Sequence, residues 1–577
     1  MKGGPAQDSG WLLRRSSGIQ SWFVSQDVQY FISLRTLLHV VCTVVVLPCV
    51  GLGQGAEPRF VTRSELVTVP AIVTDKAGAH IHGLTKANFV ILEDGKPQEI
   101  ASLEEIQAPA SPIQHVSAPQ NQFSNRFTQE SAPSQLIILV LDTINTPPAD
   151  QAYAKTELLK YLATSPDSGQ STSLLAITRT GIKVIHDFSS DRKGLADALH
   201  SFSIGNQLVE EASQEAIPKT DPETAKVLQR DREKEQQMES KERHAAIVIT
   251  LQAMQEISQY CAGLPGRKAL LWATAGFPFS ISEAQSVIKI VGPRSDSLGD
   301  VSELYQRAWK ALVQAQISVY PIDVHGLANP TYADVSISSP EADFDSHNEW
   351  KSNETHDTFQ EFAEATGGRA FYNRNDLQKA FGLAADDNRD YYLLTYYLDR
   401  RGKRPGWHRL NVRVQRAGAK IRARRGFVIA PSETKQSIQP EVQVALSSPL
   451  DYTGILINGQ WQKVVRAPEP GKMKVIFQLT MPANFAVIDE GDDNHFLVQF
   501  MAVARTETGD MANETSKTMD GHLKQETVAQ IRNSGMDYRG SLTLPPGEYT
   551  VHFAVQDHLS GRIGSVTAPL KVGSKAD

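Results

Sequence analysis

The clearest pattern in the chain is an uninterrupted apolar run, residues 136–141, which ends at Asp142. A strand with one face in solvent alternates polar and apolar residues, whereas a strand covered by helices on both faces does not. Three residues of the run are β-branched, which favours strand over helix. The run therefore predicts a buried strand of a parallel sheet. Asp142 then lies at the carboxyl end of that strand, where open α/β sheets bind ligands. The alternative is that Asp142 only caps a strand or turn.

Helical and strand-like patterns alternate along the chain after Asp142. Predicted helices cover 149–163, 191–202, 301–316, 355–365 and 377–384, and predicted strands cover 172–178, 181–188, 267–274, 317–324 and 391–398. This order predicts an α/β fold class, with a doubly wound, mainly parallel sheet that has helices on both faces. We place this domain at residues 134–430 and expect it to end in a β-hairpin, 408–430, in which apolar and polar residues alternate.

Three further regions flank the predicted α/β domain. Residues 57–107 are typical of a small β module with a hairpin turn at Asp94-Gly95. Residues 108–133 are rich in Pro, Ser, Gln and Ala, which predicts a flexible linker. Residues 431–577 predict a β-sandwich-like domain, because short strand patterns are separated by turns. The strands expected there are 442–446, 474–479, 496–504 and 549–555.

An insertion at residues 205–243 interrupts the α/β domain. Asp221 suits the N-cap of a helix, and Pro222 suits its first position. Charged residues of both signs dominate 230–243, and apolar residues then recur at helical spacing from Ile247 to Ile257. The pattern predicts one long helix with a solvated first half and a docked second half. The solvated half is an inert face, a partner-docking arm or a disordered segment.

The first 56 residues carry the features of an export signal with a long N-terminal extension. Residues 36–52 are apolar and uncharged, Arg35 precedes them, and small residues follow at 51–56. We expect cleavage after Gly53 or Ala56 and a periplasmic, cell-surface or secreted protein. The alternative is that the segment is not cleaved and anchors the chain in the membrane. We expect no other membrane contact. Cleavage leaves Cys261 as the single cysteine, so the mature chain forms no internal disulfide.

Charge and motifs narrow the range of functions. A formal net charge of −7 argues against a nucleic-acid partner, since such binders show a basic face. The sequence has no Gly-x-Ser-x-Gly elbow, no His-Glu-x-x-His motif and no convincing Cys–His pair, so we do not predict an enzyme. The arginines of residues 409–425 either form a basic stripe or, more simply, pair with acidic residues of neighbouring elements.

His80 and His82 have the spacing of two side chains on one side of an extended segment. Two such histidines are one part of a zinc site. No cysteine or third histidine lies near them in the sequence, which favours ordinary surface-loop residues.

Residues 134–398 resemble a von Willebrand factor type A domain. Asp142-Thr-Ile-Asn-Thr146 stands where that family has its Asp-x-Ser-x-Ser motif, and Ser189-Ser190-Asp191-Arg192 resembles a later segment. The layout of residues 60–430 is similar to a subgroup of exported bacterial proteins, particularly of acidobacterial type. The segments that carry this likeness are VTDKAGAHIHGLTKANFVILEDGKPQEI and HRLNVRVQRAGAKIRARRGFVIA.

The resemblance implies a site that binds a divalent cation and a protein partner. In that family an Asp, hydroxyls and residues of other loops hold the ion, and a partner's carboxylate completes its shell. Asp142 and Thr146 are the candidate metal ligands here, for Mg²⁺ or Ca²⁺, which prefer oxygen ligands. Asn145 and Ser190 are the candidate ligand-binding residues.

Two positions depart from the family's pattern. Ile144 and Ala275 stand where the family has oxygen ligands, so the expected adhesion site is degenerate. We therefore expect an exported protein-binding or adhesion module whose partners the sequence does not name. The alternative is a metal-independent structural scaffold of the periplasm or cell surface.

Overall fold

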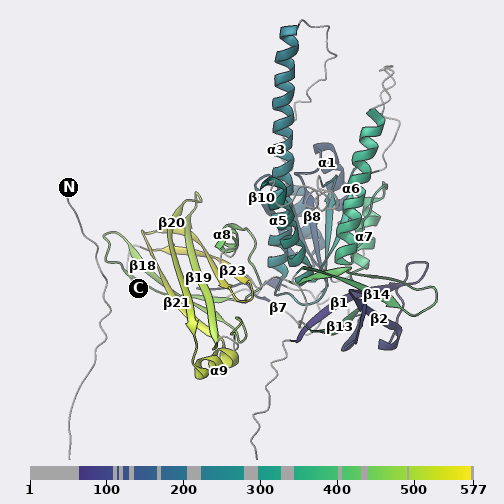
Figure 1. The fold of residues 1–577 in the computed structure, drawn as a ribbon. Coiled ribbons are helices and arrows are strands. Elements are labelled where there is room, and N and C mark those ends of the chain that lie inside the picture. The colour runs from purple at the N-terminus through teal and green to yellow at the C-terminus, as the bar shows by residue number, and fades with distance from the viewer. Residues whose placement is uncertain are drawn as a thin grey trace, which may run out of the picture. The chain divides into compact units, whose positions relative to one another are not determined.

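The computed structural model describes residues 64–107, 114–115, 121–128, 135–164, 170–203, 222–277, 296–326, 344–399, 406–429, 439–489 and 493–573 (Figure 1). The predicted export signal, residues 1–56, and the first part of the insertion, 205–221, lie outside these ranges. Among the described helices, none is long and apolar enough to cross a bilayer.

The apolar run forms the middle of a five-stranded mixed sheet. Strand β8 (Leu136–Asp142) lies between β9 (Ser171–Thr178) and β11 (Lys268–Thr274). The edge strands are β12 (Ile317–Asp323), parallel to β11, and β10 (Gly181–Ser189), antiparallel to β9. Every residue of β8 is buried, as an unbroken apolar run predicts.

Helices cover both faces of this sheet (Figure 1). The odd-numbered β8 residues, such as Ile137, share a core with three helices, α1 (Pro148–Thr164), α2 (Arg192–Ser201) and α7 (Leu377–Asp386). The even-numbered ones, such as Ile138, share a core with three others, α3 (Pro222–Cys261), α5 (Asp296–Gln314) and α6 (Phe344–Thr366).

The long helix predicted to start at Pro222, within the insertion, is confirmed as α3. Its residues Ile247, Leu251, Met254 and Ile257 are all buried in the core beneath the sheet. Residues 241–245, one turn earlier, are exposed. The change from charged to apolar spacing therefore marks the point where the helix meets the sheet.

As a description of the chain, the predicted fold class is wrong. The mixed sheet is the only one in the described residues with parallel ladders, and the other sheets are antiparallel throughout. The chain is therefore β-rich rather than a doubly wound parallel α/β protein. One reason is the strand expected at 391–398. It forms β13 (Tyr391–Asp399), which pairs antiparallel with β1 (Ser64–Thr74) and β4 (Ser102–Ile106) outside the mixed sheet.

Two segments far apart in sequence build the next pair of sheets. One sheet has the order β15-β1-β13-β4, where β15 is Lys420–Ala423. The other has the order β16-β14-β2-β3, and its strands are β16 (Gly426–Ile429), β14 (Gly406–Val414), β2 (Phe89–Glu93) and β3 (Lys96–Gln98). Each sheet combines strands from before and after the α/β region, so residues 64–106 do not form a separate module.

The hairpin expected at 408–430 is also corrected. Strand β14 pairs with β2 and β16, whereas β15 pairs with β1 in the other sheet. The chain thus leaves one sheet at the turn after Val414, adds β15 to the second sheet and returns as β16. Alternation of polar and apolar residues predicts strands, but it does not say which strand is the partner.

The C-terminal region contains two antiparallel sheets that share one hydrophobic core. Their orders are β21-β18-β17-β6 and β20-β19-β22-β23. The strands are β6 (Gln122–Ser124), β17 (Asn458–Arg466), β18 (Met473–Met481), β19 (His495–Thr506), β20 (Met511–His522), β21 (Met536–Leu544), β22 (Gly547–Asp557) and β23 (Arg562–Val572). The strands expected at 474–479, 496–504 and 549–555 are confirmed within β18, β19 and β22. A helix, α9 (Gln525–Ser534), lies between β20 and β21 in the sequence.

Two expectations near this region are wrong. Residues 442–446 belong to a helix, α8 (Gln439–Ser447), in which Val442, Ala445 and Leu446 are buried at helical spacing. The linker expected at 108–133 contains β6 and β7 (Phe127–Thr128), so it is not flexible throughout. Phe123 is buried in the C-terminal core, and the Asn125 side chain hydrogen-bonds the backbone of Tyr452, Ile455 and Ile457.

Candidate functional site

Asp142 ends β8 at the carboxyl edge of the mixed sheet, where the sequence places a metal ligand. Its side chain is buried. Oδ1 accepts hydrogen bonds from the backbone N–H groups of Ile144 (3.2 Å) and Asn145 (3.0 Å). Oδ2 accepts from the Asn145 amide (2.8 Å) and the Trp272 indole (3.0 Å), and the Thr274 hydroxyl lies 3.1 Å away.

These hydrogen bonds occupy the lone pairs with which the Asp142 carboxylate would bind a metal ion. A carboxylate offers about four lone-pair positions, and four N–H donors already point at them. Burial raises the pKa of Asp142, although hydrogen bonds from Asn145, Trp272 and Thr274 oppose that shift. The cavity beside Asp142 measures ≈ 10 Å³, which is about the space of one water molecule. The arrangement favours a structural carboxylate that holds the turn after β8.

The other candidates of this site have structural partners as well. Thr146 is buried, and its hydroxyl accepts a hydrogen bond from the Ala275 N–H at 3.1 Å. The Asn145 amide, besides bonding Asp142, donates to the Thr250 hydroxyl of α3 at 2.9 Å. Ile144 packs against the core beneath the sheet. Asp142, Asn145 and Thr146 therefore lie together, but they fasten the turn to β11 and α3.

Ser190 lies at the opposite end of the sheet. Because β10 is antiparallel to β9, its last residue, Ser189, pairs with Thr172, and Thr172 pairs with Ile137 at the start of β8. Asp142 lies five positions beyond Ile137 along β8, which is about 17 Å along a strand. Ser190 therefore does not join the Asp142 group.

A second polar group lies at the end of β12. Asp323 is buried and is 3.1 Å from the imidazoles of both His325 and His356. Burial opposes ionisation of Asp323, but these hydrogen bonds outweigh it and lower the pKa of the carboxyl. The same contact raises the pKa of His325. Strand β11 separates Asp323 from Asp142, so the two carboxylates do not share a ligand.

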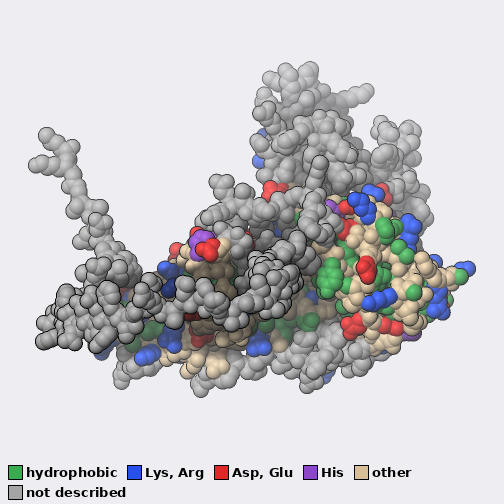
Figure 2. Space-filling view, turned by 60° about the horizontal axis from the view of Figure 1, so that its bottom comes forward, with side chains coloured by type: hydrophobic (Ala, Val, Ile, Leu, Met, Phe, Trp, Pro, Cys, Tyr) green, Lys and Arg blue, Asp and Glu red, His purple; other side chains and the backbone are tan. Residues whose placement is uncertain are grey.

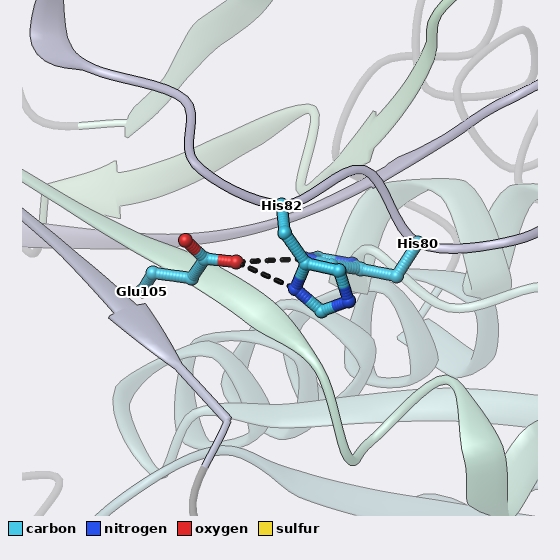
Figure 3. A group of neighbouring side chains, drawn as sticks. All are labelled: His80, His82 and Glu105. Carbon is cyan, nitrogen blue, oxygen red and sulfur yellow. Dashed lines mark hydrogen bonds and ion pairs between the residues drawn. The ribbon is translucent and has the colours of Figure 1, made fainter.

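The structure brings His80 and His82 together with a carboxylate that the sequence does not indicate. His82 Nδ1 is 2.8 Å, and His80 Nε2 is 3.6 Å, from the same oxygen of Glu105 (Figure 3). Both ring nitrogens of His80 are buried and have no hydrogen-bond partner. The sequence signal was the His-x-His spacing, but Glu105 enters only through the pairing of β4 with β13.

A similar group of Glu93, Asp94 and His408 lies at the β2–β3 turn. His408 Nδ1 is 2.7 Å from Asp94 Oδ2, and Asp94 Oδ1 accepts the Arg409 N–H at 2.8 Å. Asp94 and Gly95 have positive φ, as a two-residue hairpin turn requires. Here the carboxylate secures the hairpin to β14.

A cavity of ≈ 1260 Å³ lies against α5, the end of α6, strands β14 and β15, and the two residues that follow β15. We call it the Trp309 groove. Five arginines and two glutamates line it together with Tyr305, Trp309 and Trp407. The charged residues are Arg369, Arg409, Arg422, Arg424, Arg425, Glu361 and Glu364.

The pairing with acidic neighbours that was expected for the arginines of residues 409–425 is confirmed in part. Arg422 forms two hydrogen bonds of 2.6 Å with Asp387, and Arg425 pairs with Glu364. In contrast, the Nε donors of Arg369 and Arg424 are buried without an acceptor, and so is the Trp309 indole N–H. Burial lowers the pKa of Arg424 to about 10, so the guanidinium stays charged at neutral pH. The groove therefore has more donors and positive charge than the protein itself satisfies.

The arginine surplus is local. Over the described surface in Figure 2, Lys and Arg side chains lie among Asp and Glu side chains rather than forming one basic face. This agrees with the net charge of −7. The groove differs because five arginines and only two glutamates line one cavity.

Comparison with known proteins identifies no family. No family model matches the chain, and no curated protein matches it. Among solved structures, a glycosyl hydrolase family 2 member from Bacteroides cellulosilyticus aligns with 32% of this chain and 20% of its own, at 6% identity and a TM-score of 0.14. An endonuclease/exonuclease/phosphatase from Beutenbergia cavernae aligns with 32% of this chain and 39% of its own, at 14% identity and a TM-score of 0.12. The alignments span less than half of either chain, and likeness at these scores carries no functional argument.

Proposed function

We propose that this chain is an exported protein-binding module that takes an acidic segment of its partner into the Trp309 groove. The observation that carries the proposal is the set of buried donors on the groove wall without an acceptor, those of Trp309, Arg369 and Arg424. A buried donor without a partner costs about 1–3 kcal/mol. A ligand that supplies carboxylate oxygens recovers that cost at each donor it reaches.

Charge and aromatic content support the same choice. Carboxylates form strong, charge-assisted hydrogen bonds with guanidinium groups. Trp407 is 47% exposed and lies edge-on to the buried Trp309, with ring centroids 5.7 Å apart. Tryptophan and arginine are the residues most enriched among those that dominate binding energy at protein interfaces. The groove thus offers an apolar anchor beside a cationic wall.

The size of the groove favours a peptide segment over a small molecule. Its volume of ≈ 1260 Å³ exceeds the range of about 300–1,000 Å³ typical of small-molecule pockets. The proposal moves the contact surface away from the Asp142 edge and needs no metal, since the Asp142 carboxylate already has four N–H donors.

A poly-glutamate peptide tests this proposal, with poly-lysine as the matched probe. Titration of the full chain, followed by tryptophan fluorescence, should show binding of poly-glutamate that weakens with added salt. Arg424→Gln should weaken binding at least tenfold, because one donor and one charge are lost. Trp407→Ala should act in the same direction through the anchor. Arg466→Gln, an exposed arginine of β17, is the control and should bind as the wild type does.

Three results would count against the groove. Equal affinity for poly-glutamate and poly-lysine would remove the electrostatic argument. Equal affinity of wild type and Arg424→Gln would place the peptide elsewhere. Absence of binding by any acidic peptide would favour the second candidate, a metal-independent structural scaffold.

Export is the remaining part of the proposal and rests on residues 36–56 of the sequence. N-terminal sequencing of the protein purified from its own cells should begin near Gln54 or Glu57. An intact N-terminus that stays in the membrane fraction would contradict cleavage and favour the anchor.

A further inference from the structure

We propose that His80, His82 and Glu105 bind a zinc ion, with water as the fourth ligand. The site is separate from the Trp309 groove and does not depend on the function proposed for it. His80 and His82 follow the turn after β1, and Glu105 lies on β4. Figure 3 shows both imidazoles directed at one carboxylate oxygen.

The local backbone explains why both histidines lie on the same side. Gly78, at φ +94°, completes a turn in which the Ala79 N–H donates to the Asp75 side chain at 2.9 Å. The chain then runs back beside β1: His80 bridges Thr74, and the Ile81 N–H donates to the Val73 carbonyl at 2.9 Å. In extended backbone, residues two apart project to the same face.

Tyr392 of β13 holds this segment in place. Its buried hydroxyl donates to the Ile81 carbonyl (2.8 Å) and accepts from the Leu84 N–H (3.1 Å). The His80 ring stacks on the Tyr392 ring with centroids 5.3 Å apart. Tyr392 is also the register partner of Glu105. One residue therefore positions both the histidine segment and the strand that supplies the carboxylate, which is the outer support that metal sites need.

The distances suit zinc. In a tetrahedral site with bonds of about 2.0–2.1 Å, neighbouring ligand atoms lie about 3.4 Å apart. The two histidine–carboxylate separations are 3.6 and 2.8 Å, and all three ligand atoms lie within 4.8 Å of one another. Two imidazoles with one carboxylate suit zinc, whereas Mg²⁺ and Ca²⁺ prefer oxygen ligands throughout.

His80 supplies the second, independent observation. Its side chain is 9% exposed, yet neither ring nitrogen has a hydrogen-bond partner. Buried imidazole nitrogens are normally satisfied, so Nε2, which lies on the side of Glu105, indicates a missing ligand. His82 is 54% exposed, which leaves a route for the ion and a position for water.

Ligand protonation provides a further check on the site. His82 Nδ1 and Glu105 Oε1 are 2.8 Å apart and share a proton. Zinc ligands must be deprotonated, so the ion takes the place of that proton, and the affinity for zinc should fall as the pH falls.

Calorimetric titration of Zn²⁺ into the full chain, without a histidine tag and stripped by chelator, is the test. We expect one equivalent to bind, unaffected by excess Mg²⁺, and the melting temperature to rise. His80→Gln and Glu105→Gln should each weaken binding at least a hundredfold. His200→Gln, an exposed histidine on α2, is the control and should leave the titration unchanged.

The visible absorption spectrum of bound Co²⁺ tests the site in the wild-type chain, so the test does not depend on a variant that fails to fold. Wild-type chain loaded with Co²⁺ should give the intense visible bands of a tetrahedral site. Weak octahedral bands, or no zinc binding, would overturn the proposal. Unchanged binding in folded His80→Gln would do the same. Binding that persists in His80→Gln but is lost in His408→Gln would move the ion to Glu93, Asp94 and His408, which is equally a refutation.

Discussion

At the scale of single residues, the meaning of Asp142 depends on neighbours that its own segment does not reveal. The sequence shows a carboxylate at the end of a buried run, which is equally typical of a metal ligand and of a structural cap. Trp272 decides between them, because its indole donates to Asp142 from the adjacent strand, β11. Strand order brings these residues together, although 130 positions separate them in sequence. The position of Asp142 was predictable, whereas its hydrogen-bond partners were not.

Asp142→Ala should reduce the free energy of unfolding by about 2–5 kcal/mol. The substitution leaves the buried Trp272 indole without an acceptor, at a cost of about 1–3 kcal/mol, and the half-buried N–H donors of residues 144 and 145 each add a smaller cost. Denaturant unfolding followed by circular dichroism measures the change. Added Mg²⁺ should not shift the wild-type midpoint, because the carboxylate has no free position.

Asp197→Ala is the matched control, since Asp197 is exposed on α2 and should change stability by no more than about 0.5 kcal/mol. Stabilisation of the wild type by Mg²⁺, lost in Asp142→Ala, would revive the metal-binding interpretation. A fully stable Asp142→Ala chain would show that the hydrogen bonds matter less than their burial suggests.

Glu105 illustrates the same limit for the zinc site. His80 and His82 were visible as a pair because extended backbone repeats every two residues. Glu105 is 23 positions beyond His82, and nothing in its own segment distinguishes it from Glu104. Only the antiparallel register of β4 against β13 turns Glu105 toward the histidines.

At the scale of elements, the helices and strands that have long periodic patterns were predicted correctly, whereas the pairing of strands was not. The unbroken run of β8 and the apolar spacing of α3 each reflect burial by many neighbours, so the patterns are long and redundant. The strand at 391–398 is as apolar as β8, and its sequence cannot say whether parallel or antiparallel neighbours cover it. It became β13 of an antiparallel sheet.

The short strands were not predicted from the sequence, for a different reason. Strand β6 has three residues in a polar stretch, and only Phe123 marks its burial. Its place is fixed by pairing with β17 and by Asn125, whose side chain reaches three backbone groups between Tyr452 and Ile457. Composition alone suggested a linker, because polar side chains that satisfy distant backbone groups look the same as solvated ones.

At the scale of the whole molecule, residues 64–106 and 391–429 depend on one another. Strand β13 has β1 on one side and β4 on the other, and β15 has its ladder with β1. The β13 side chains Tyr391, Tyr392, Leu394 and Tyr396 are all buried. The core that contains most of them also includes β8, α5 and α6, so loss of the N-terminal strands exposes the interior of the α/β region.

A chain that begins at residue 108 should therefore fail to unfold cooperatively and should aggregate. It loses β1 to β4, so β13 loses both neighbours and β14 loses β2. Exposure of each large apolar side chain costs about 1.5–3 kcal/mol, so exposure of several of them costs as much as the total of about 5–15 kcal/mol that stabilises a domain. The matched control begins at Arg63, where the compact unit starts, and should melt as the full chain does. Scanning calorimetry with light scattering compares the two. A shortened chain that melts in one sharp transition at the full-chain temperature would show that 64–106 is an independent module, as the sequence first suggested.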